Sequence, residues 1–301
     1  MIKYIKRQDL DVDKYDKCIE TSLQSRVYAF SWYLDIVADN WDVLVLDDYN
    51  VVMPIPWRKK MGIKYLYPPF WMIELGFFSK DKEQSLKPFL DVILKKFKFS
   101  ELRLNTKNNT FKSDFLVFKQ LQFLDLSKSY ESIFKEFNRN RKREVAKAKK
   151  HDLVENWNDN PELLITIFKE NIGNRVKELK ENDYINLLKL MQISIEKKVG
   201  ELLTIYDANN KLIAAAFFFK HKNRVTQLVC ASDLSNRKNG AHTFFNDRAI
   251  FKYQPHFQEY NFGGSSMKNI ANYYRSFGAL TEEYQQIKYN NLPFLLKLFK
   301  H

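Results

Sequence analysis

Residues 261–280 read Asn-Phe-Gly-Gly-Ser-Ser-Met-Lys-Asn-Ile-Ala-Asn-Tyr-Tyr-Arg-Ser-Phe-Gly-Ala-Leu, and no other stretch says more about the structure. Gly263 and Gly264 allow backbone angles that a β-carbon forbids, so they predict a tight turn. Ser265 or Ser266 can then cap a helix, because apolar residues repeat at helical spacing at Ile270, Tyr273, Tyr274 and Phe277. Gly278 ends that helix. A strand end, a turn and a helix that follow one another with almost no spare residue are typical of a functional site.

Length and composition set the limits of the answer. The chain has 301 residues, of which 45% are hydrophobic and 15% aromatic, enough for one large domain or two of about 150 residues each. No run approaches the ~20 apolar residues that cross a bilayer, and charges interrupt the N-terminal stretch where a signal peptide would have its apolar region. We therefore expect a cytoplasmic protein. Cys18 and Cys230 are far apart in apolar surroundings, which predicts two core residues rather than a disulfide or a metal site.

The formal charge of +13 predicts partners that carry phosphate or other negative charge. The basic residues concentrate between Lys135 and His151, where eight lysines and arginines face only Glu136 and Glu144. An apolar stripe from Tyr130 to Phe137 precedes them, so we expect one helix beginning at Ser129. Its basic turns are either a solvated helix face or a polyanion-binding surface, with candidates Arg139, Arg141, Lys142, Arg143 and Lys147.

The order of predicted elements is similar in the two halves of the chain. The first half has helices at 13–22 and 32–38, strands at 41–46, 51–57 and 64–67, a helix at 82–96, and extended segments at 101–105 and 115–126. The second has a strand at 153–157, helices at 162–171 and 184–197, strands at 202–206, 212–220 and 224–231, a helix at 242–253, and a strand at 259–262. The helix after Gly264 and a strand at 283–289 complete it. Periodicity alone indicates a mixed α/β fold.

The glycine turn and the helix that ends in Tyr274-Arg-Ser-Phe-Gly resemble the C-terminal signature of the Fem-type aminoacyltransferases, within the FemAB-like branch of the GNAT acyltransferases. The basic segment Asn138-Arg-Asn-Arg-Lys-Arg is similar to the one that opens the second domain of that group and lies beside its substrate cleft. The resemblance implies two tandem GNAT-like domains around a central cleft, residues 1–127 and 128–301, with the last ~15 residues returning to the first domain. It covers most of the chain and is motif-specific only from about Asn138 onward.

GNAT proteins hold the pyrophosphate of CoA where a helix begins after the third central strand, because free N–H groups and the helix dipole favour an anion. The corresponding donor loop here is Arg237-Lys238-Asn239-Gly240-Ala241-His242. Arg237 and Gly240 fit the family pattern, whereas His242 replaces a small residue. A plain exposed loop explains the same residues. Fem-type enzymes take aminoacyl-tRNA instead, through phosphate contacts that suit the basic helix.

The first half has Pro68-Pro69-Phe70-Trp71 where a donor loop would stand, so we assign it to acceptor recognition. Arg58, Tyr67, Trp71 and Glu74 are the candidate residues. Tyr67 and Trp71 belong to an aromatic group that packs as core or forms a ligand platform.

Acyl transfer to an amine needs a positioned acceptor, a polarised carbonyl and a proton for the leaving group. GNAT enzymes often take that proton from a tyrosine on the helix after the fifth strand, so Tyr273 and Tyr274 are candidates, one of which we expect in the core. Lys268 and Arg275 are placed to stabilise charge, and Asp233 is either a general base or a loop cap. Gly263, Gly264 and Ser265 let the donor approach the backbone or form only a tight turn. The five histidines show no metal-ligand spacing.

The sequence thus predicts an acyl- or aminoacyltransferase without metal or tightly bound cofactor. The resemblance implies acyl-CoA or aminoacyl-tRNA as donor and an amine such as a cell-wall precursor as acceptor, reached in the cytoplasm or at the inner face of the membrane. The alternative is a non-catalytic protein on a degenerate GNAT scaffold that binds RNA or an anionic membrane through the basic helix.

Overall fold

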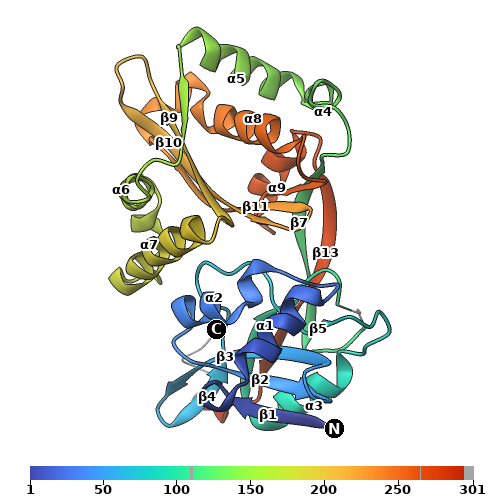
Figure 1. Cartoon of the computed structure of the whole chain (residues 1–301). Helices are drawn as coiled ribbons and strands as arrows, with labels where there is room; N and C mark the ends of the chain where they lie inside the picture. Colours follow the sequence, from blue (N-terminus) through green and yellow to red (C-terminus); the bar gives the residue numbers. More distant parts are fainter. Residues whose placement is uncertain (109–110, 265, 295–301) are drawn as a thin grey trace. The chain divides into compact units, whose positions relative to one another are not determined.

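The computed structural model describes residues 1–108, 111–264 and 266–294, with the side chains of Asn174, Asn236 and Arg237 outside the described set. The chain forms two compact units (Figure 1). The first comprises Met1–Lys119 and the described residues from Glu283 onward, and the second comprises Gln120–Glu282. The chain therefore enters the second unit within one strand, β7 (Leu116–Asp125), and leaves it within another, β13 (Leu280–Asn290).

The first unit is a mixed sheet with helices. Its strands lie in the order β1, β2, β3, β4, β6, β13, with β5 paired to β3. Among the strand pairs of its described residues, β4 and β6 run parallel and the others run antiparallel. The elements are β1 (Ile2–Lys6), α1 (Val12–Thr21), α2 (Ser31–Val37), β2 (Trp41–Leu46), β3 (Val51–Lys60), β4 (Ile63–Leu66), β5 (Phe78–Ser79), α3 (Lys87–Lys96) and β6 (Phe99–Arg103).

The second unit is also a mixed sheet, in the order β7, β12, β11, β10, β9, β8. Its strands are β8 (Val154–Trp157), β9 (Gly200–Tyr206), β10 (Leu212–His221), β11 (Arg224–Ser232) and β12 (Glu259–Asn261). Its helices are α4 (Tyr130–Glu136), α5 (Arg139–Lys150), α6 (Glu162–Asn171), α7 (Glu181–Glu196), the 3-10 turn η4 (Leu234–Asn239), α8 (Ala241–Tyr253) and α9 (Lys268–Arg275).

Helices cover both faces of this second sheet, α8 on one and α6 and α7 on the other (Figure 1). The covering explains why β10 is a continuous apolar run in which residues 213–219 are all buried. Its alternate residues Ala214, Ala216 and Phe218 pack with α8, while Phe217 points to the opposite face. The mixed α/β prediction is confirmed.

Two expectations about single elements are wrong. The helix expected to run on from Ser129 is two helices, because Phe137 ends α4 with its ring in the core and the Asn138 side chain caps α5 by accepting from the Arg141 N–H. The helix expected from Lys82 begins at Lys87, where Pro88 occupies its first turn. Strand β1 was not predicted, and its partner β2 lies about 40 residues away along the chain.

Both cysteines are free, as expected. Cys18 is buried in the first unit, and Cys230 packs against the apolar core of the second. Burial raises the pKa of the Cys18 thiol to about 11 and that of Cys230 to about 12, with weaker opposing effects of neighbouring groups. Neither is a thiolate at neutral pH.

Candidate active site

The second sheet opens between β11 and β12. The two strands pair in parallel over three residues only, from Arg224 opposite Glu259 to Thr226 opposite Asn261. Strand β11 then continues to Ser232 without a partner in β12, since the chain after Asn261 turns away at Gly263 and Gly264. A bulge in β10 between Phe217 and Phe218 lies opposite the same part of β11. This opening is where substrate-binding groups of an α/β sheet gather.

Buried polar side chains occupy the opening. The Tyr260 hydroxyl lies 3.0 Å from Oε1 of Gln227 and 3.2 Å from Oδ1 of Asn246. Asn246 Nδ2 donates to the His242 carbonyl at 3.0 Å and lies 3.5 Å from the Tyr273 hydroxyl. Tyr260 and Asn246 are fully buried. Because buried polar groups cost free energy unless they are paired, such a network fixes the positions of its members closely.

The two candidate tyrosines on α9 have different surroundings. Tyr274 lies in the core, its ring stacked on Phe262 with a centroid distance of 4.6 Å. Tyr273 lies about 100° around the helix, where its hydroxyl donates to the His242 carbonyl at 3.1 Å. Burial raises the pKa of Tyr273 well above its usual value, while Thr243 and Arg141 act in the opposite direction. Tyr273 is therefore a protonated phenol beside the opening of the sheet.

Arg141 points inward from the basic helix. Its Nη1 donates to the Thr243 hydroxyl at 2.6 Å, and its guanidinium carbon lies 4.6 Å from the centroid of the Tyr273 ring. The Nε atom is buried and has no partner among the described residues. A planar cation on an aromatic face is favourable by about 1 kcal/mol or more when it is withdrawn from water. The structure thus places Arg141 beside Tyr273 rather than on an exposed basic surface.

The donor loop leads into the N-terminus of α8 and packs against α5. Gly240 has φ 83° and caps α8, and a β-carbon there would lie 2.4 Å from the Glu144 carbonyl oxygen. Asn239 Oδ1 already accepts the Ala241 N–H at 3.0 Å. His242 Nδ1 lies 3.2 Å from the Ser232 hydroxyl. The Arg237 side chain lies outside the described set, and Lys238 is exposed beside a hollow of 270 Å³.

Asp233 has the geometry of a cap. Its Oδ1 accepts from the Ser235 N–H at 2.8 Å, which begins η4, and its Oδ2 pairs with Lys211 at 2.8 Å. Both carboxylate oxygens therefore have positively polarised partners. Of the two interpretations of Asp233, the cap is the one with observed contacts.

The glycine turn before α9 is also tight. The Gly263 N–H donates to Oδ1 of Asn261 at 2.9 Å, and a β-carbon at Gly264 would lie 3.1 Å from Cβ of Leu121. Ser265 lies outside the described residues. Lys268 and Arg275, at the two ends of α9, are exposed.

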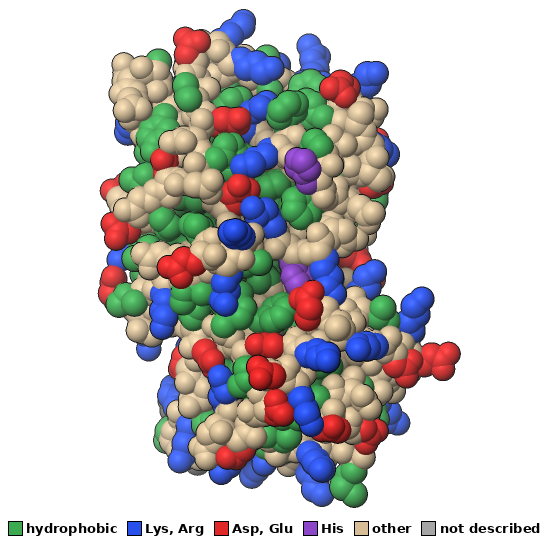
Figure 2. Space-filling view, viewed as in Figure 1, with side chains coloured by type: hydrophobic (Ala, Val, Ile, Leu, Met, Phe, Trp, Pro, Cys, Tyr) green, Lys and Arg blue, Asp and Glu red, His purple; other side chains and the backbone are tan. Residues whose placement is uncertain are grey.

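The other basic residues of α5 face solvent to different degrees. Arg139 and Arg143 are exposed, whereas Lys142 and Lys147 are half-buried, and Lys142 donates to the Lys135 carbonyl at 2.7 Å. Figure 2 shows lysine and arginine side chains along the top of the view, where Figure 1 places α5. Arg139 and Arg143 are thus on the solvent side of α5, whereas Arg141 is directed at Thr243, and polyanion binding by this helix stays a prediction.

The four acceptor candidates fall into two groups in the first unit. Arg58 forms two hydrogen bonds to Asp39, of 2.6 and 3.0 Å, and its guanidinium carbon lies 4.0 Å from the centroid of the Tyr67 ring. Glu74 is buried and pairs with Arg26 at 2.5 Å. Trp71 is half-buried with φ 64°, and its carbonyl accepts from Tyr33.

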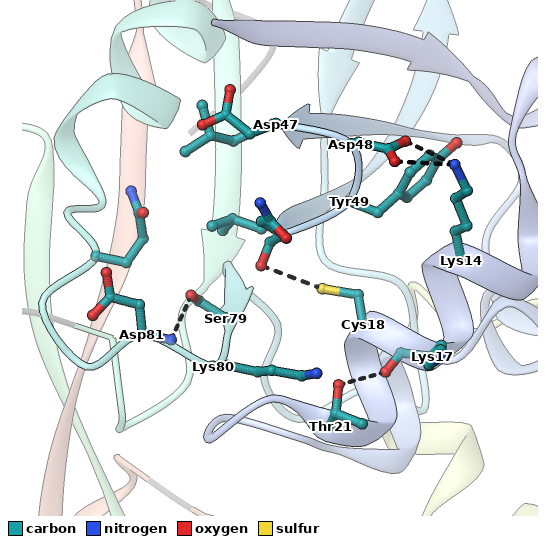
Figure 3. A pocket seen from close by; sticks show the side chains of 14 residues that line it. Lys14, Lys17, Cys18, Thr21, Asp47, Asp48, Tyr49, Ser79, Lys80 and Asp81 are labelled. Atoms are coloured by element: carbon teal, nitrogen blue, oxygen red, sulfur yellow. Dashed lines mark hydrogen bonds and ion pairs between the residues drawn. The ribbon is translucent and has the colours of Figure 1, made fainter.

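A hollow of 600 Å³ in the first unit lies elsewhere (Figure 3). Lys17, Lys80 and Cys18 are among the residues that line it, and Lys14 pairs with Asp48 at 2.8 Å. The four acceptor candidates are not among its lining residues.

Within the described residues, no group of three or more His, Cys, Asp or Glu side chains is arranged to hold a metal ion. Among the same residues, no helix is long and apolar enough to span a bilayer.

The sequence matches no protein-family model and no curated protein sequence. Its structure, however, is similar to that of FemX, with a TM-score of 0.66 and 12% identity over 99% of this chain and 100% of FemX. The fold is Fem-type and GNAT-like. The C-terminal domain of a putative lysylphosphatidylglycerol synthetase from Agrobacterium fabrum follows at a TM-score of 0.57 and 10% identity, over 96% of this chain and 94% of that one.

A tandem GNAT protein from the clavulanic acid biosynthesis pathway is similar too, with a TM-score of 0.53 and 9% identity over 96% of this chain and 97% of that one. The Fem-type resemblance and the mixed α/β class are thereby confirmed at the level of the fold. Structural similarity at 9 to 12% identity shows the fold alone, so the roles of the site residues depend on their own geometry.

Sequence reasoning missed the polar network itself. Gln227, Thr243, Asn246 and Tyr260 lie in segments that read as buried strand or helix, and burial class alone does not distinguish a polar network from ordinary packing. One signal was present, because Asn246-Asp247 interrupts the apolar run of α8 at positions that face the core.

Proposed function

We propose that this protein is an N-acyltransferase that moves an aminoacyl or acyl group from an activated carrier to an amine. Support at the level of the fold comes from the Fem-type and GNAT-like neighbours. The observation that carries the proposal is Tyr273, a protonated phenol beside the opening between β11 and β12, with Arg141 over its ring. A transferase of this kind needs a proton donor at such a position.

In the proposed reaction the amine nitrogen attacks the donor carbonyl. A C–N bond forms and the C–O bond of an aminoacyl-tRNA ester, or the C–S bond of a CoA thioester, breaks. The leaving oxygen or sulfur takes the proton of the Tyr273 hydroxyl, and the surplus ammonium proton passes to solvent, from which the phenol is restored. The polar network of Asn246 and Tyr260 holds the Tyr273 hydroxyl in place, and Arg141 stabilises the phenolate while the proton is away.

The details of the donor loop favour aminoacyl-tRNA over CoA. The Ala241 N–H is already bonded to Asn239, and His242 stands where close approach of a pyrophosphate needs a small side chain. Exposed Arg139 and Arg143 on α5 supply the charges that bind a phosphate backbone. We propose an amine-bearing cell-wall precursor as acceptor, with Arg58 and Tyr67 as acceptor-binding candidates, and no metal or tightly bound cofactor. Asp233 serves as the cap of η4.

A direct transfer assay tests the proposal. The purified protein is incubated with a mixture of radiolabelled aminoacyl-tRNAs, or with acyl-CoA thioesters, and with peptide-bearing cell-wall precursors. We expect label in the precursor that survives mild base, because an amide resists conditions that hydrolyse the aminoacyl ester. Salt-dependent tRNA binding without transfer to any amine would instead support the non-catalytic polyanion-binding protein, which the exposed basic residues of α5 also suit.

A further inference from the structure

A second hollow in the second unit has a strongly positive lining. It has a volume of 470 Å³, within the ~300–1,000 Å³ of typical small-molecule sites. Its walls come from the turn before β9, the tip of the β10–β11 hairpin and the end of α8. Four lysines line it, namely Lys198, Lys220, Lys222 and Lys252, together with His221, His256, Tyr253 and Phe257.

One carboxylate lies among these lysines. Glu201, the single carboxylate among the described lining residues, is 8% exposed and accepts from Lys252 at 2.9 Å and from the Tyr253 hydroxyl at 2.7 Å. The Lys220 ammonium lies 3.6 Å from Oε2 of Glu201, the oxygen that accepts from Tyr253. The Lys252 ammonium also lies 3.6 Å from the centroid of the Trp157 ring. These contacts hold two ammonium groups in fixed positions at the base of the hollow.

The charge balance leaves a large positive surplus. Taken by themselves, the lining residues carry four lysines against one carboxylate, a formal charge of +3, and the C-terminal end of α8 contributes only about half a negative charge. Lys198 and Lys222 are exposed, and each has the left-handed backbone conformation of a tight turn, with φ values of 59° and 53°. Ammonium groups gathered around one hollow repel each other, and a bound anion removes that repulsion.

The hollow is separate from the candidate active site. His242 lies in the first turn of α8, on the side of Tyr273, whereas Lys252 lies ten residues later, about 15 Å along the helix axis. The hollow is also lined by the end of β10 and the turn that follows it, and not by the part of β11 that leaves β12. A ligand there occupies neither the donor loop nor the polar network.

We propose that this hollow binds a phosphorylated small molecule. The described lining carries its positive charge on lysines, and lysine ammonium groups bind phosphate as point charges. Phe257 and His256 give one wall an apolar and aromatic surface for the organic part of the molecule. The phosphate group comes either as free inorganic phosphate or as a phosphate ester, and the two are distinguished by experiment.

The test is isothermal titration calorimetry of the full chain with inorganic phosphate and with adenosine 5′-monophosphate at low salt. The double variant Lys198→Gln with Lys222→Gln removes two rim charges and leaves the Glu201 contacts intact. The matched control, Lys177→Gln with Lys189→Gln, removes two exposed charges elsewhere in the same unit. We expect saturable binding by the parent, about tenfold weaker binding by the rim variant, and less than about a twofold change in the control. Tighter binding of the nucleotide than of phosphate identifies an ester as the ligand.

Three outcomes would overturn the proposal. One is equal weakening in the rim and control variants, which would mean that net charge alone is responsible. Another is no saturable binding of either probe at concentrations on the order of 10 mM. The third is loss of tRNA binding in the rim variant while neither small probe binds, which would make the hollow part of a polyanion surface. Circular dichroism of each variant verifies that the fold is retained.

Discussion

A β-carbon at Gly240 would lie 2.4 Å from the carbonyl oxygen of Glu144. The donor loop and the basic helix α5 are therefore in backbone contact at this residue, and the glycine is required by that contact as well as by its φ of 83°. A substitution at Gly240 changes the packing of two helices before it changes any ligand contact. Loss of activity in such a variant is consequently no measure of donor binding.

We predict that Gly240→Ala lowers the free energy of unfolding by about 2–4 kcal/mol, the sum of left-handed backbone strain and overpacking. Gly62 provides a matched control, because its φ is 79° and a β-carbon there meets nothing within 4 Å. Gly62→Ala should lose only the backbone part, about 1–2 kcal/mol. Chemical denaturation of both variants measures the difference, and equal losses would show that the Glu144 contact yields easily.

We predict that loss of the hydroxyl group has different effects on transfer activity at the two tyrosines of α9. Tyr273→Phe removes the hydroxyl that donates to His242 and should reduce transfer by roughly a hundredfold at a stability cost of about 1 kcal/mol. Tyr274→Phe keeps the ring stacked on Phe262 and should retain activity. Single-turnover assays with a donor that the parent uses measure both. Full activity of Tyr273→Phe would remove it as the proton donor.

The basic helix should separate into inward and outward residues. Arg139→Gln with Arg143→Gln should leave the free energy of unfolding within about 1 kcal/mol and weaken tRNA binding, with a shallower salt dependence because fewer counterions are released. Arg141→Gln should instead destabilise the fold by more than 1 kcal/mol, since it loses the bond to Thr243 and the contact with the Tyr273 ring. Filter binding across a salt series and thermal denaturation provide the two measurements. Similar results for the two variants would mean that Arg141 is an ordinary surface residue.

The lowered pKa of Glu201 predicts that the folded protein loses stability in acid. Burial by itself raises the pKa of Glu201, but hydrogen bonds from Lys252 and Tyr253 and the charge of Lys220 outweigh it, so the pKa lies below its usual 4.5. Between the folded pKa and 4.5 the unfolded chain binds more protons at this residue than the folded chain does. Stability therefore rises with pH through that window, and the contribution is complete above it.

Replacing Glu201 with glutamine should flatten the stability profile below pH 4.5 and lower stability at pH 7, where Lys252 loses its charged partner. The exposed Glu196, at the end of α7, offers a control in Glu196→Gln, which should follow the parent profile. Denaturation at pH values from 3 to 7 provides the comparison. An unchanged slope in Glu201→Gln would show that folding does not lower the pKa of this carboxyl group.

Local patterns were enough to predict the glycine turn, α9 and its end near Gly278, because each depends on residues a few positions apart. The same holds for the apolar strand β10. The break between α4 and α5 had a readable signal, an asparagine in capping position at Asn138, that the apolar stripe obscured. The inward direction of Arg141 had none, since its partners Thr243 and Tyr273 are more than 100 residues away in the chain. Contacts between residues so far apart in the chain also determine the polar network, and the spacing of hydrophobic residues contains no information about such contacts.

Because of strand β13, the folding of the first unit depends on the order in which the ribosome makes the chain. Its residues from Gln286 onward pair with β6 from Arg103 backward, so the sheet of the first unit is completed by residues made about 180 positions later. At ~5–20 residues per second a ribosome takes about 10–40 s to make that stretch. During this interval β6 has an unpaired edge, and the second unit is made in full before Gln286 is added. A nascent chain of this protein is thus expected to fold from the middle outward, and its first unit is the part most exposed to chaperones and to pairing with the wrong strand.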